Sequence, residues 1–207
     1  AIARRMAQSK REAPHFYLTM DIDMTEAQRL RHQLNEALSA LRPETGSRQS
    51  RETPAGSIFL KESEGSAKGE ASGDAAHVSV NDMIVASALA LARFPNMNAS
   101  YSEAGIVRHE KINVGVAIAL KDGLIAPAVV DCAAKGLAQI SRESRDLAER
   151  AKGGRLKPEE YAGPTFTVSN LGMYDVDTFI AIISPPQAAI LAVGAVRPRP
   201  VVRDGQI

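Results

Sequence analysis

The residues best suited to chemistry in this sequence follow an alternating segment near its C-terminal end. The stretch TFTVSNLG, residues 165–172, ends in a hydroxyl, an amide and a glycine. Ser169 and Asn170 can close a turn by hydrogen bonding to their own backbone, and Gly172 can supply a positive φ. The alternative is that the Ser169 hydroxyl points at a ligand, as an oxyanion donor does. The local sequence favours the turn and leaves the ligand open.

The histidines and the single thiol offer no convincing base or nucleophile to accompany Ser169. His32 lies among polar neighbours in a helical pattern, and His77 and His109 lie in polar, loop-like contexts. His15 follows a proline and opens an alternating segment, so a structural hydrogen bond is favoured and a ligand contact stays open. Cys132 follows an apolar run with no activating base nearby, which favours a buried, inert thiol.

Common catalytic motifs are absent from the sequence. There is no G-x-x-x-x-G-K-[ST] phosphate loop, no G-x-G-x-x-G, no H-E-x-x-H, no paired cysteine motif and no G-x-S-x-G. These motifs mark nucleotide binding, metal catalysis and serine hydrolases. The sequence therefore indicates no metal site and none of these activities.

The elements that position these residues can be read from the period of the apolar side chains. Helices are predicted at 24–41 with Thr25 as N-cap, from Asn81 or Asp82 to about Phe94, and at 136–152, with a turn or short helix at 156–161. Strands are predicted at 15–23, 112–120, 124–130 and 163–170, and the Lys121-Asp122-Gly123 turn predicts a hairpin; the apolar run at 188–196 is assigned no element. Helices and strands intersperse without regular alternation, which favours an α/β sandwich on a mixed sheet.

Residues 43–77 differ in composition from the rest of the chain. They hold five glycines, many Ser and Glu, and one apolar island at residues 58–60. Such a segment buries too little surface to offset its loss of chain entropy. We expect a flexible insertion in a single domain that spans residues 1–207.

Composition and charge exclude several classes of function. The net charge is +1, there is no Trp, and Phe and Tyr number five and four, so neither electrostatics nor stacking indicates a nucleic-acid partner. No apolar run approaches the ~18–20 residues that span a membrane. The one cysteine is compatible with a reducing compartment.

Five blocks of the sequence resemble, in the same order, the catalytic domain of the dihydrolipoamide acyltransferases, the E2 components of 2-oxo acid dehydrogenase complexes. They are IARRMAQSKREAPHFYLTMDID, VSVNDMIVASALALA, VGVAIALKDGLIAPAVV, LKPEEYAGPTFTVSNLGMY and FIAIISPPQAAILAVGA. The resemblance covers the chain except for residues 43–77. The last two blocks are most similar to the acetyltransferases of pyruvate dehydrogenase complexes.

The resemblance implies a fold, a reaction and a set of partners. The fold is an α/β sandwich like chloramphenicol acetyltransferase, with a mixed β-sheet and packed helices, assembled as homotrimers that build a larger core. The reaction is acetyl transfer between the dihydrolipoyl arm of a separate lipoyl domain and coenzyme A, with no metal. Further partners are the E1 and E3 components, bound through domains outside this sequence. The compartment is the cytoplasm in a bacterium or the mitochondrial matrix in a eukaryote.

The resemblance also implies roles for particular residues. Ser169 matches a serine that donates a hydrogen bond to the tetrahedral oxyanion, while a histidine in an H-x-x-x-D-G motif removes the thiol proton. Further candidates for the substrate channel are Asn170, Gly172, Gly123, Leu124, Ile125, Pro127 and His15.

The sequence departs from the family pattern at several positions. The H-x-x-x-D-G motif is absent from residues 1–207, so we expect a fragment clipped at both ends that is inactive alone. The helix after Asn81-Asp82 lacks the family's lysine. Gly163-Pro164 and Asp175 stand where the family often has glycines, and the charge of Asp175 has no explanation in the sequence. Two alternatives follow, a non-catalytic core subunit and a succinyl or branched-chain acyltransferase of the same family.

Overall fold

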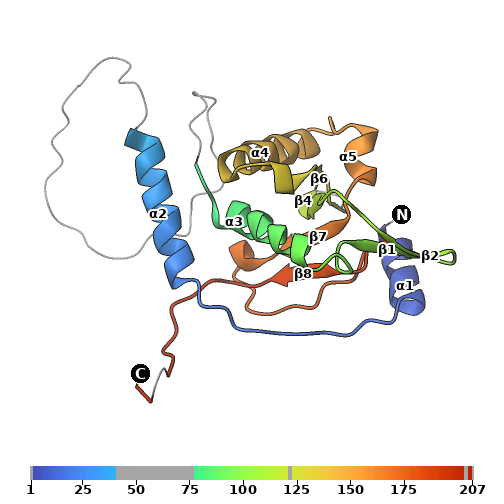
Figure 1. Cartoon of the computed structure of the whole chain (residues 1–207), viewed down its shortest axis with the longest axis horizontal. Helices are drawn as coiled ribbons and strands as arrows, with labels where there is room; N and C mark the ends of the chain where they lie inside the picture. The colour runs from blue at the N-terminus through green and yellow to red at the C-terminus, as the bar shows by residue number, and fades with distance from the viewer. Residues whose placement is uncertain (1, 41–76, 121–122, 203–204, 207) are drawn as a thin grey trace, which may run out of the picture.

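A mixed β-sheet forms the centre of the molecule. The computed structural model describes residues 2–40, 77–120, 123–202 and 205–206, so the predicted insertion lies outside the described residues except for His77. The four strands follow the order β6 (Ala128–Val129), β3 (Val114–Val116), β7 (Phe166–Asn170) and β8 (Ile190–Val193). β3, β7 and β8 run parallel, and β6 runs antiparallel to β3. The predicted mixed sheet is confirmed (Figure 1).

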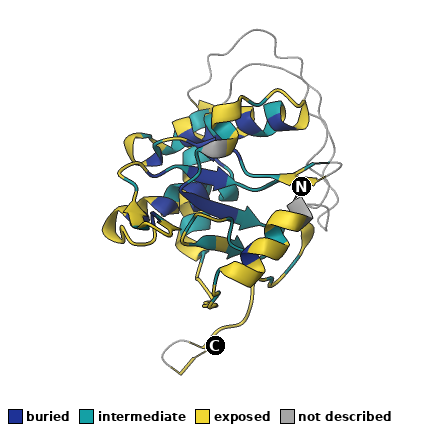
Figure 2. Ribbon diagram, turned by 90° about the vertical axis from the view of Figure 1, so that its right-hand side faces the viewer, coloured by how far each residue is buried: buried dark blue, intermediate teal, exposed yellow. Residues whose placement is uncertain are grey.

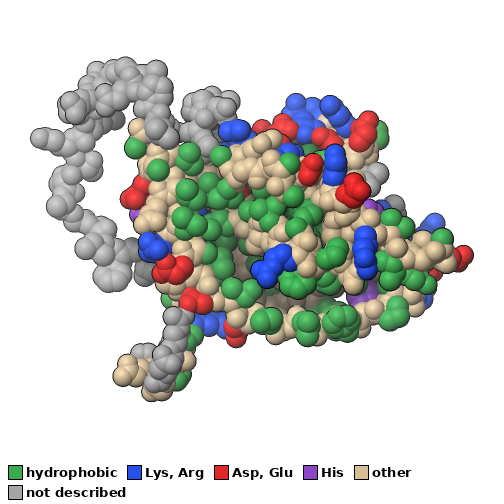
Figure 3. Space-filling model, in the orientation of Figure 1, with side chains coloured by type: hydrophobic (Ala, Val, Ile, Leu, Met, Phe, Trp, Pro, Cys, Tyr) green, Lys and Arg blue, Asp and Glu red, His purple; other side chains and the backbone are tan. Residues whose placement is uncertain are grey.

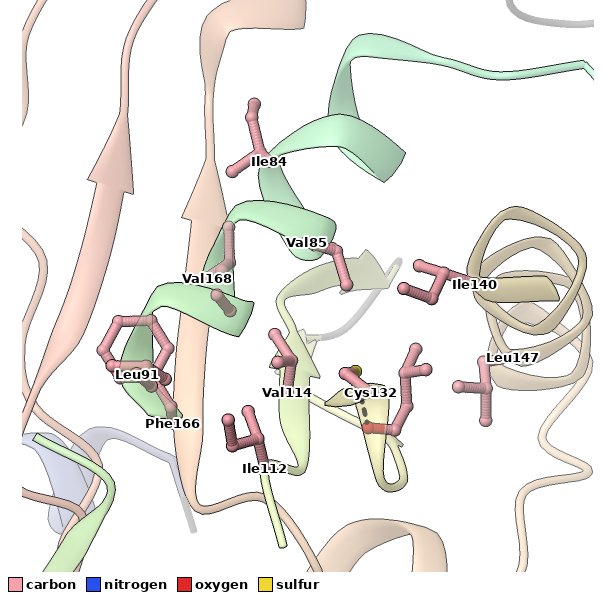
Figure 4. Packing of buried hydrophobic residues seen from close by; sticks show 12 residues of the cluster. Ile84, Val85, Leu91, Ile112, Val114, Cys132, Ile140, Leu147, Phe166 and Val168 are labelled. Carbon is pink, nitrogen blue, oxygen red and sulfur yellow. Dashed lines mark hydrogen bonds between the residues drawn. The ribbon is translucent and has the colours of Figure 1, made fainter. Parts of the chain in front are cut away.

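Two helical segments cover one face of this sheet. α3 (Val80–Ser87) continues into the 3-10 helix η1 (Ala88–Arg93), and α4 (Leu137–Lys152) lies beside it. Their apolar side chains meet those of β3 and β7 in one core (Figure 4). Fully buried members of this core include Val85, Val114, Val129, Cys132, Ile140 and Val168. The helices predicted at 81–94 and 136–152 are therefore confirmed, with the first tightening after Ser87.

The N-terminus of α3 is capped by Ser79, two or three residues before the predicted Asn81 or Asp82. The Ser79 hydroxyl accepts the Asp82 N–H at 3.1 Å, and the Asp82 carboxylate accepts the Ser79 N–H at 2.8 Å. This reciprocal pair is a capping box, which satisfies two helix-terminal donors at once. Asp82 is thus a partner of the cap, and Ser79 is the cap itself.

The strand predicted at 112–120 is interrupted at Ala117. Its second part, β4 (Ile118–Leu120), pairs with β5 (Gly123–Ile125) and confirms the predicted hairpin. The register of the two strands places Pro127 opposite Val116, next to the interruption, and Pro127 has no N–H to donate across the ladder. Val116 N–H still donates to the Pro127 carbonyl at 3.0 Å, and the ladder resumes as β6.

A second hairpin was not predicted from the sequence. β1 (Ala99–Ser102) pairs antiparallel with β2 (Gly105–Arg108), and Gly105 takes a φ of 125° at the turn. Its side chains are largely exposed, so its residues carry little of the apolar alternation that marks a half-buried strand.

The N-terminal region differs most from the sequence prediction. α1 (Ile2–Glu12) was not predicted, and the strand predicted at 15–23 is wrong, because residues 14–24 pair with no strand among the described residues. Phe16, Leu18, Met20 and Ile22 alternate but are 73–83% exposed. Figure 3 shows hydrophobic side chains along the edge where Figure 1 draws this segment. Alternation makes a strand possible, but only a neighbouring backbone completes one.

α2 (Thr25–Ala40) confirms the predicted amphipathic helix, although none of its residues is buried. At its N-terminus the side chain that accepts the backbone N–H belongs to Asp23, 2.9 Å from the Thr25 nitrogen, so the prediction of Thr25 as N-cap was wrong. Asn35 holds the helix to the body through both backbone groups of Val78, at 2.8 and 3.0 Å.

The C-terminal elements confirm two predictions and add one strand. α5 (Pro158–Ala162) is the short helix predicted at 156–161, and β7 is the strand predicted at 163–170. β8 occupies Ile190–Val193, within the apolar run at 188–196 for which no element was predicted. Figure 2 shows that the central strands are more buried than the helices and loops around them, and that α1 is largely exposed.

A charged pair that ties α4 to α5 should make stability depend on pH. The Arg150 guanidinium donates to both Glu160 oxygens at 2.7 and 2.8 Å, which lowers the pKa of Glu160 below its ordinary 4.5. A carboxylate with a lowered folded-state pKa stabilises the protein above its unfolded pKa and loses that contribution as pH falls through the folded value. Glu160→Gln should therefore destabilise the protein at pH 7 and lose this difference from wild type below about pH 4.5.

Urea unfolding at a series of pH values measures this difference. Glu159→Gln is the matched control, since Glu159 lies in the same helix and forms no ion pair among the described residues. A gap between wild type and Glu160→Gln that persists unchanged to pH 3 would contradict the prediction.

Candidate active site

Ser169 lies at the carboxyl end of β7, and its hydroxyl has no hydrogen-bond partner among the described residues. Phe166 and Val168 pack into the core, so Thr167 and Ser169 face the other side of the sheet. Ala192 of β8 is the register partner of Ser169, and a small side chain there leaves the hydroxyl room. Ser169 is half-buried, and its hydroxyl forms no hydrogen bond with any residue that the structure describes. It can therefore donate to a ligand.

Asn170 makes the turn that follows Ser169. Its Oδ1 accepts the Gly172 N–H at 2.8 Å, as the turn interpretation predicted, and its Nδ2 lies 3.5 Å from Asn81 Oδ1. The Asn170 amide thus forms hydrogen bonds within the chain, while the neighbouring Ser169 hydroxyl forms none with the described residues. The turn interpretation fits Asn170, and the ligand interpretation is compatible with Ser169.

Gly172 is required for space and not for a positive φ, which corrects the prediction. A Cβ on Gly172 would lie 2.6 Å from the Gly194 carbonyl oxygen, closer than real contacts allow. The residue with positive φ in this turn is Asp175, at 63°. The turn therefore packs directly against the backbone that follows β8.

The segment 123–125 lies at the same end of the sheet as Ser169. The β4–β5 hairpin continues β3 beyond Ala117, whose N–H donates to the Val168 carbonyl at 2.9 Å. Because β3 and β7 are parallel, the hairpin extends past the carboxyl end of β7. Gly123 and Leu124 are exposed there and Ile125 is half-buried. Pro127 is fully buried, so its contribution within the chain is to the sheet. The channel role of this segment stays a prediction.

His15 serves as a structural bridge. Its Nε2 accepts the Ile183 N–H at 3.1 Å, so the ring proton lies on Nδ1, which is 2.6 Å from the Ala13 carbonyl oxygen. Both ring nitrogens have hydrogen-bond partners within the chain, which agrees with the structural interpretation.

The remaining candidates lie elsewhere. His109 Nε2 is 2.7 Å from Ser100 Oγ, and His32 Nε2 is 3.2 Å from Glu36 Oε1 on the surface of α2. No hydrogen bond joins a described histidine to Ser169. Cys132 is fully buried, which raises the pKa of its thiol, and its Sγ lies 3.3 Å from the Val129 carbonyl oxygen.

Neither a metal cluster nor a membrane-crossing helix is found in the described part of the chain. The described ranges contain no group of three or more His, Cys, Asp or Glu side chains placed to hold an ion. None of the described helices is long and apolar enough to cross a membrane. The chemistry that the site offers is hydrogen-bond donation from a hydroxyl on a rigid strand end.

One known protein family matches the whole chain. The model of the 2-oxoacid dehydrogenases acyltransferase family (catalytic domain) matches residues 1–207. The chain belongs to this family. The resemblance noted in its sequence blocks is thereby confirmed, and the assignment includes the blocks around Ser169.

Relatives of the family show how much of a longer protein the chain matches. It is 40% identical over 207 residues to the dihydrolipoyllysine-residue acetyltransferase component of the pyruvate dehydrogenase complex of Rhizobium meliloti, covering 100% of the chain and 40% of that protein. It is 39% identical over 205 residues to the mitochondrial dihydrolipoyllysine-residue acetyltransferase component 3 of the pyruvate dehydrogenase complex of Arabidopsis thaliana. This match covers 98% of the chain and 32% of that protein. The chain thus spans about two fifths or less of the length of these relatives.

Solved structures of the family confirm the predicted fold. A probable dihydrolipoamide acetyltransferase from Listeria monocytogenes superposes with a TM-score of 0.77 at 29% identity, over 99% of the chain and 74% of that structure. The cubic core of a pyruvate dehydrogenase multienzyme complex gives the same TM-score at 24% identity, over 98% and 71%. The second likeness is evidence for the fold only.

Proposed function

We propose that this chain is the catalytic domain of an acetyltransferase that moves an acetyl group between the dihydrolipoyl arm of a lipoyl domain and coenzyme A. The observation that carries the proposal is the free hydroxyl of Ser169 at the carboxyl end of β7. The family assignment and the names of the most similar relatives, which are pyruvate dehydrogenase acetyltransferases, support it.

The reaction needs a donor where negative charge develops. A thiolate attacks the thioester carbonyl carbon, a new C–S bond forms, and the carbonyl oxygen becomes an oxyanion. When the tetrahedral species collapses, the old C–S bond breaks and the other thiolate leaves. Ser169 would donate to the oxyanion from a strand that is already ordered, so little reorganisation is needed during the reaction.

The thiol must also lose a proton. A free thiol has a pKa of about 8.5, so a base near neutral pH raises the thiolate fraction. The family resemblance assigns this step to a histidine in an H-x-x-x-D-G motif, a pattern that residues 1–207 do not contain. In this proposal Ser169 stabilises the charge, and Gly123 and Leu124 border the approach to it; their exposure on the β4–β5 hairpin supports the second role.

We further propose that the domain works as a homotrimer within a larger core, with a lipoyl domain and the E1 and E3 components as partners. The relatives come from bacteria and from mitochondria, which supports the cytoplasm or the matrix as the compartment. The relatives from Rhizobium meliloti and Rickettsia felis are named as components of pyruvate dehydrogenase complexes, which supports work within a larger assembly.

The acyl preference tests the proposed function. With the natural gene product that carries this sequence, kcat/KM for transfer to dihydrolipoamide should be higher for acetyl-CoA than for isobutyryl-CoA or succinyl-CoA, by about 10-fold or more, because small differences in acyl size are worth that much in a fitted pocket. A higher rate with a larger acyl group would favour the succinyl or branched-chain alternative. No transfer with any acyl group would favour the structural core subunit.

A further inference from the structure

Two segments leave the sheet side by side next to Ser169. β7 and β8 are parallel, so the segments that follow them leave the sheet at the same end of the strands. Beyond the ladder, Leu171 N–H donates to the Val193 carbonyl at 3.0 Å and Ala195 N–H donates to the Val176 carbonyl at 2.9 Å. A Cβ on Gly194 would lie 1.9 Å from the Asp177 carbonyl oxygen. The turn after Ser169 is therefore held in backbone contact with the segment after β8.

Four charged side chains continue this contact. The Arg197 guanidinium lies 2.5 Å from Asp175 Oδ1 and 3.1 Å from Asp177 Oδ1, and it donates to the Asp175 carbonyl at 2.9 Å. Arg199 lies 3.1 Å from the same Asp177 oxygen. The two aspartates lie on the segment after β7 and the two arginines on the segment after β8, so the group as a whole is neutral. We call Asp175, Asp177, Arg197 and Arg199 the charge clasp.

The clasp is poorly placed to contribute to folding stability. The Asp175 side chain is 85% exposed and that of Arg199 57%, and exposed ion pairs contribute little to stability. A planar guanidinium that contacts two carboxylates and a carbonyl does, however, hold a definite geometry. Asp175 also keeps a left-handed φ of 63°, so the turn takes one particular path to reach Arg197.

The position of the Ser169 hydroxyl depends on this path. No described side chain bonds the hydroxyl, so its place is determined by the backbone at the end of β7 and by the turn that begins at Asn170. The clasp anchors the far end of that turn against the segment that extends Ala192, the register partner of Ser169. Without the clasp, the turn keeps its backbone contacts and the hydrogen bonds of the Asn170 side chain, all of which lie nearer to Ser169 or to β8 than the charged pairs do.

We propose that the charge clasp positions Ser169 for acyl transfer. The proposal rests on the proposed acetyltransferase function. It makes Arg197 and Asp175 positioning residues, which touch neither substrate nor the reacting atoms and act through the backbone of the Ser169 turn. It also assigns a role to the charge of Asp175, which the sequence left unexplained.

The test is a double-mutant cycle in the natural gene product that carries this sequence. Arg197→Gln should lower kcat for acetyl transfer by about 10-fold and leave KM for coenzyme A within about twofold, because small displacements of a catalytic group cost rate. Arg197→Lys, which keeps one point charge, should recover part of the loss. Arg29→Gln, which breaks an exposed ion pair on α2, is the matched control.

The Ser169→Ala background separates positioning from general damage. If the clasp acts through Ser169, Arg197→Gln should cause little additional loss there. An equal loss in both backgrounds would overturn the proposal, as would an unchanged kcat in Arg197→Gln.

Hydrogen exchange tests the clasp without an activity assay. Arg197→Gln should speed exchange at residues 171–177 and 193–197 with no change in α4, and unchanged exchange would overturn the clasp even if acetyl transfer is observed. Absence of acetyl transfer in wild type with faster exchange in the variant would instead overturn the proposed function and the catalytic part of the inference, leaving the clasp as an anchor of this turn.

Discussion

Replacement of Ser169 by alanine is expected to lower kcat for acetyl transfer by about 100-fold, the usual cost of removing one oxyanion donor. The hydroxyl is free of hydrogen bonds among the described residues, so its removal leaves no buried group without a partner. Folding stability should therefore change little. The effect should appear in kcat more than in KM, because the bond strengthens as charge develops on the oxygen.

Steady-state kinetics with acetyl-CoA and dihydrolipoamide, together with thermal unfolding, measure this result. Ser102→Ala is the matched control, since Ser102 also ends a strand but is exposed and bonds locally to the Gly105 carbonyl. A loss of kcat much smaller than about 10-fold in Ser169→Ala would show that the oxyanion role is wrong.

Replacement of Gly194 by alanine is expected to cause the largest loss of stability among these substitutions, about 3 kcal/mol. The added Cβ would lie 1.9 Å from the Asp177 carbonyl oxygen and 2.8 Å from its carbon. Both are backbone atoms, so neither can move away as a flexible side chain would. The two segments would have to separate, and the end of β7 that carries Ser169 would move with them, so kcat should fall as well.

Chemical denaturation measures the change in the free energy of unfolding. Gly136→Ala is the matched control, because a Cβ there meets no atom within 4 Å and the residue lacks a positive φ. Equal stabilities of Gly194→Ala and Gly136→Ala would contradict the close approach of the two segments.

Local patterns predicted the elements whose apolar side chains recur with the period of a helix or a strand. α2 and α4 carry apolar residues at helical spacing, and β7 alternates, so all three were predicted. α1 was missed because its sequence is largely polar, and the strand at 15–23 was wrong because alternation does not supply a pairing partner.

By itself, the sequence determined the family, through five blocks in a shared order, and placed Ser169 at the end of a strand. The tertiary structure alone decided how the neighbouring residues are used. Gly172 lies against Gly194, and Asp175 pairs with Arg197, which is 22 residues away. Such pairings depend on two parallel strands leaving the sheet together, and residues so far apart in the chain show no sign of them in their local sequence.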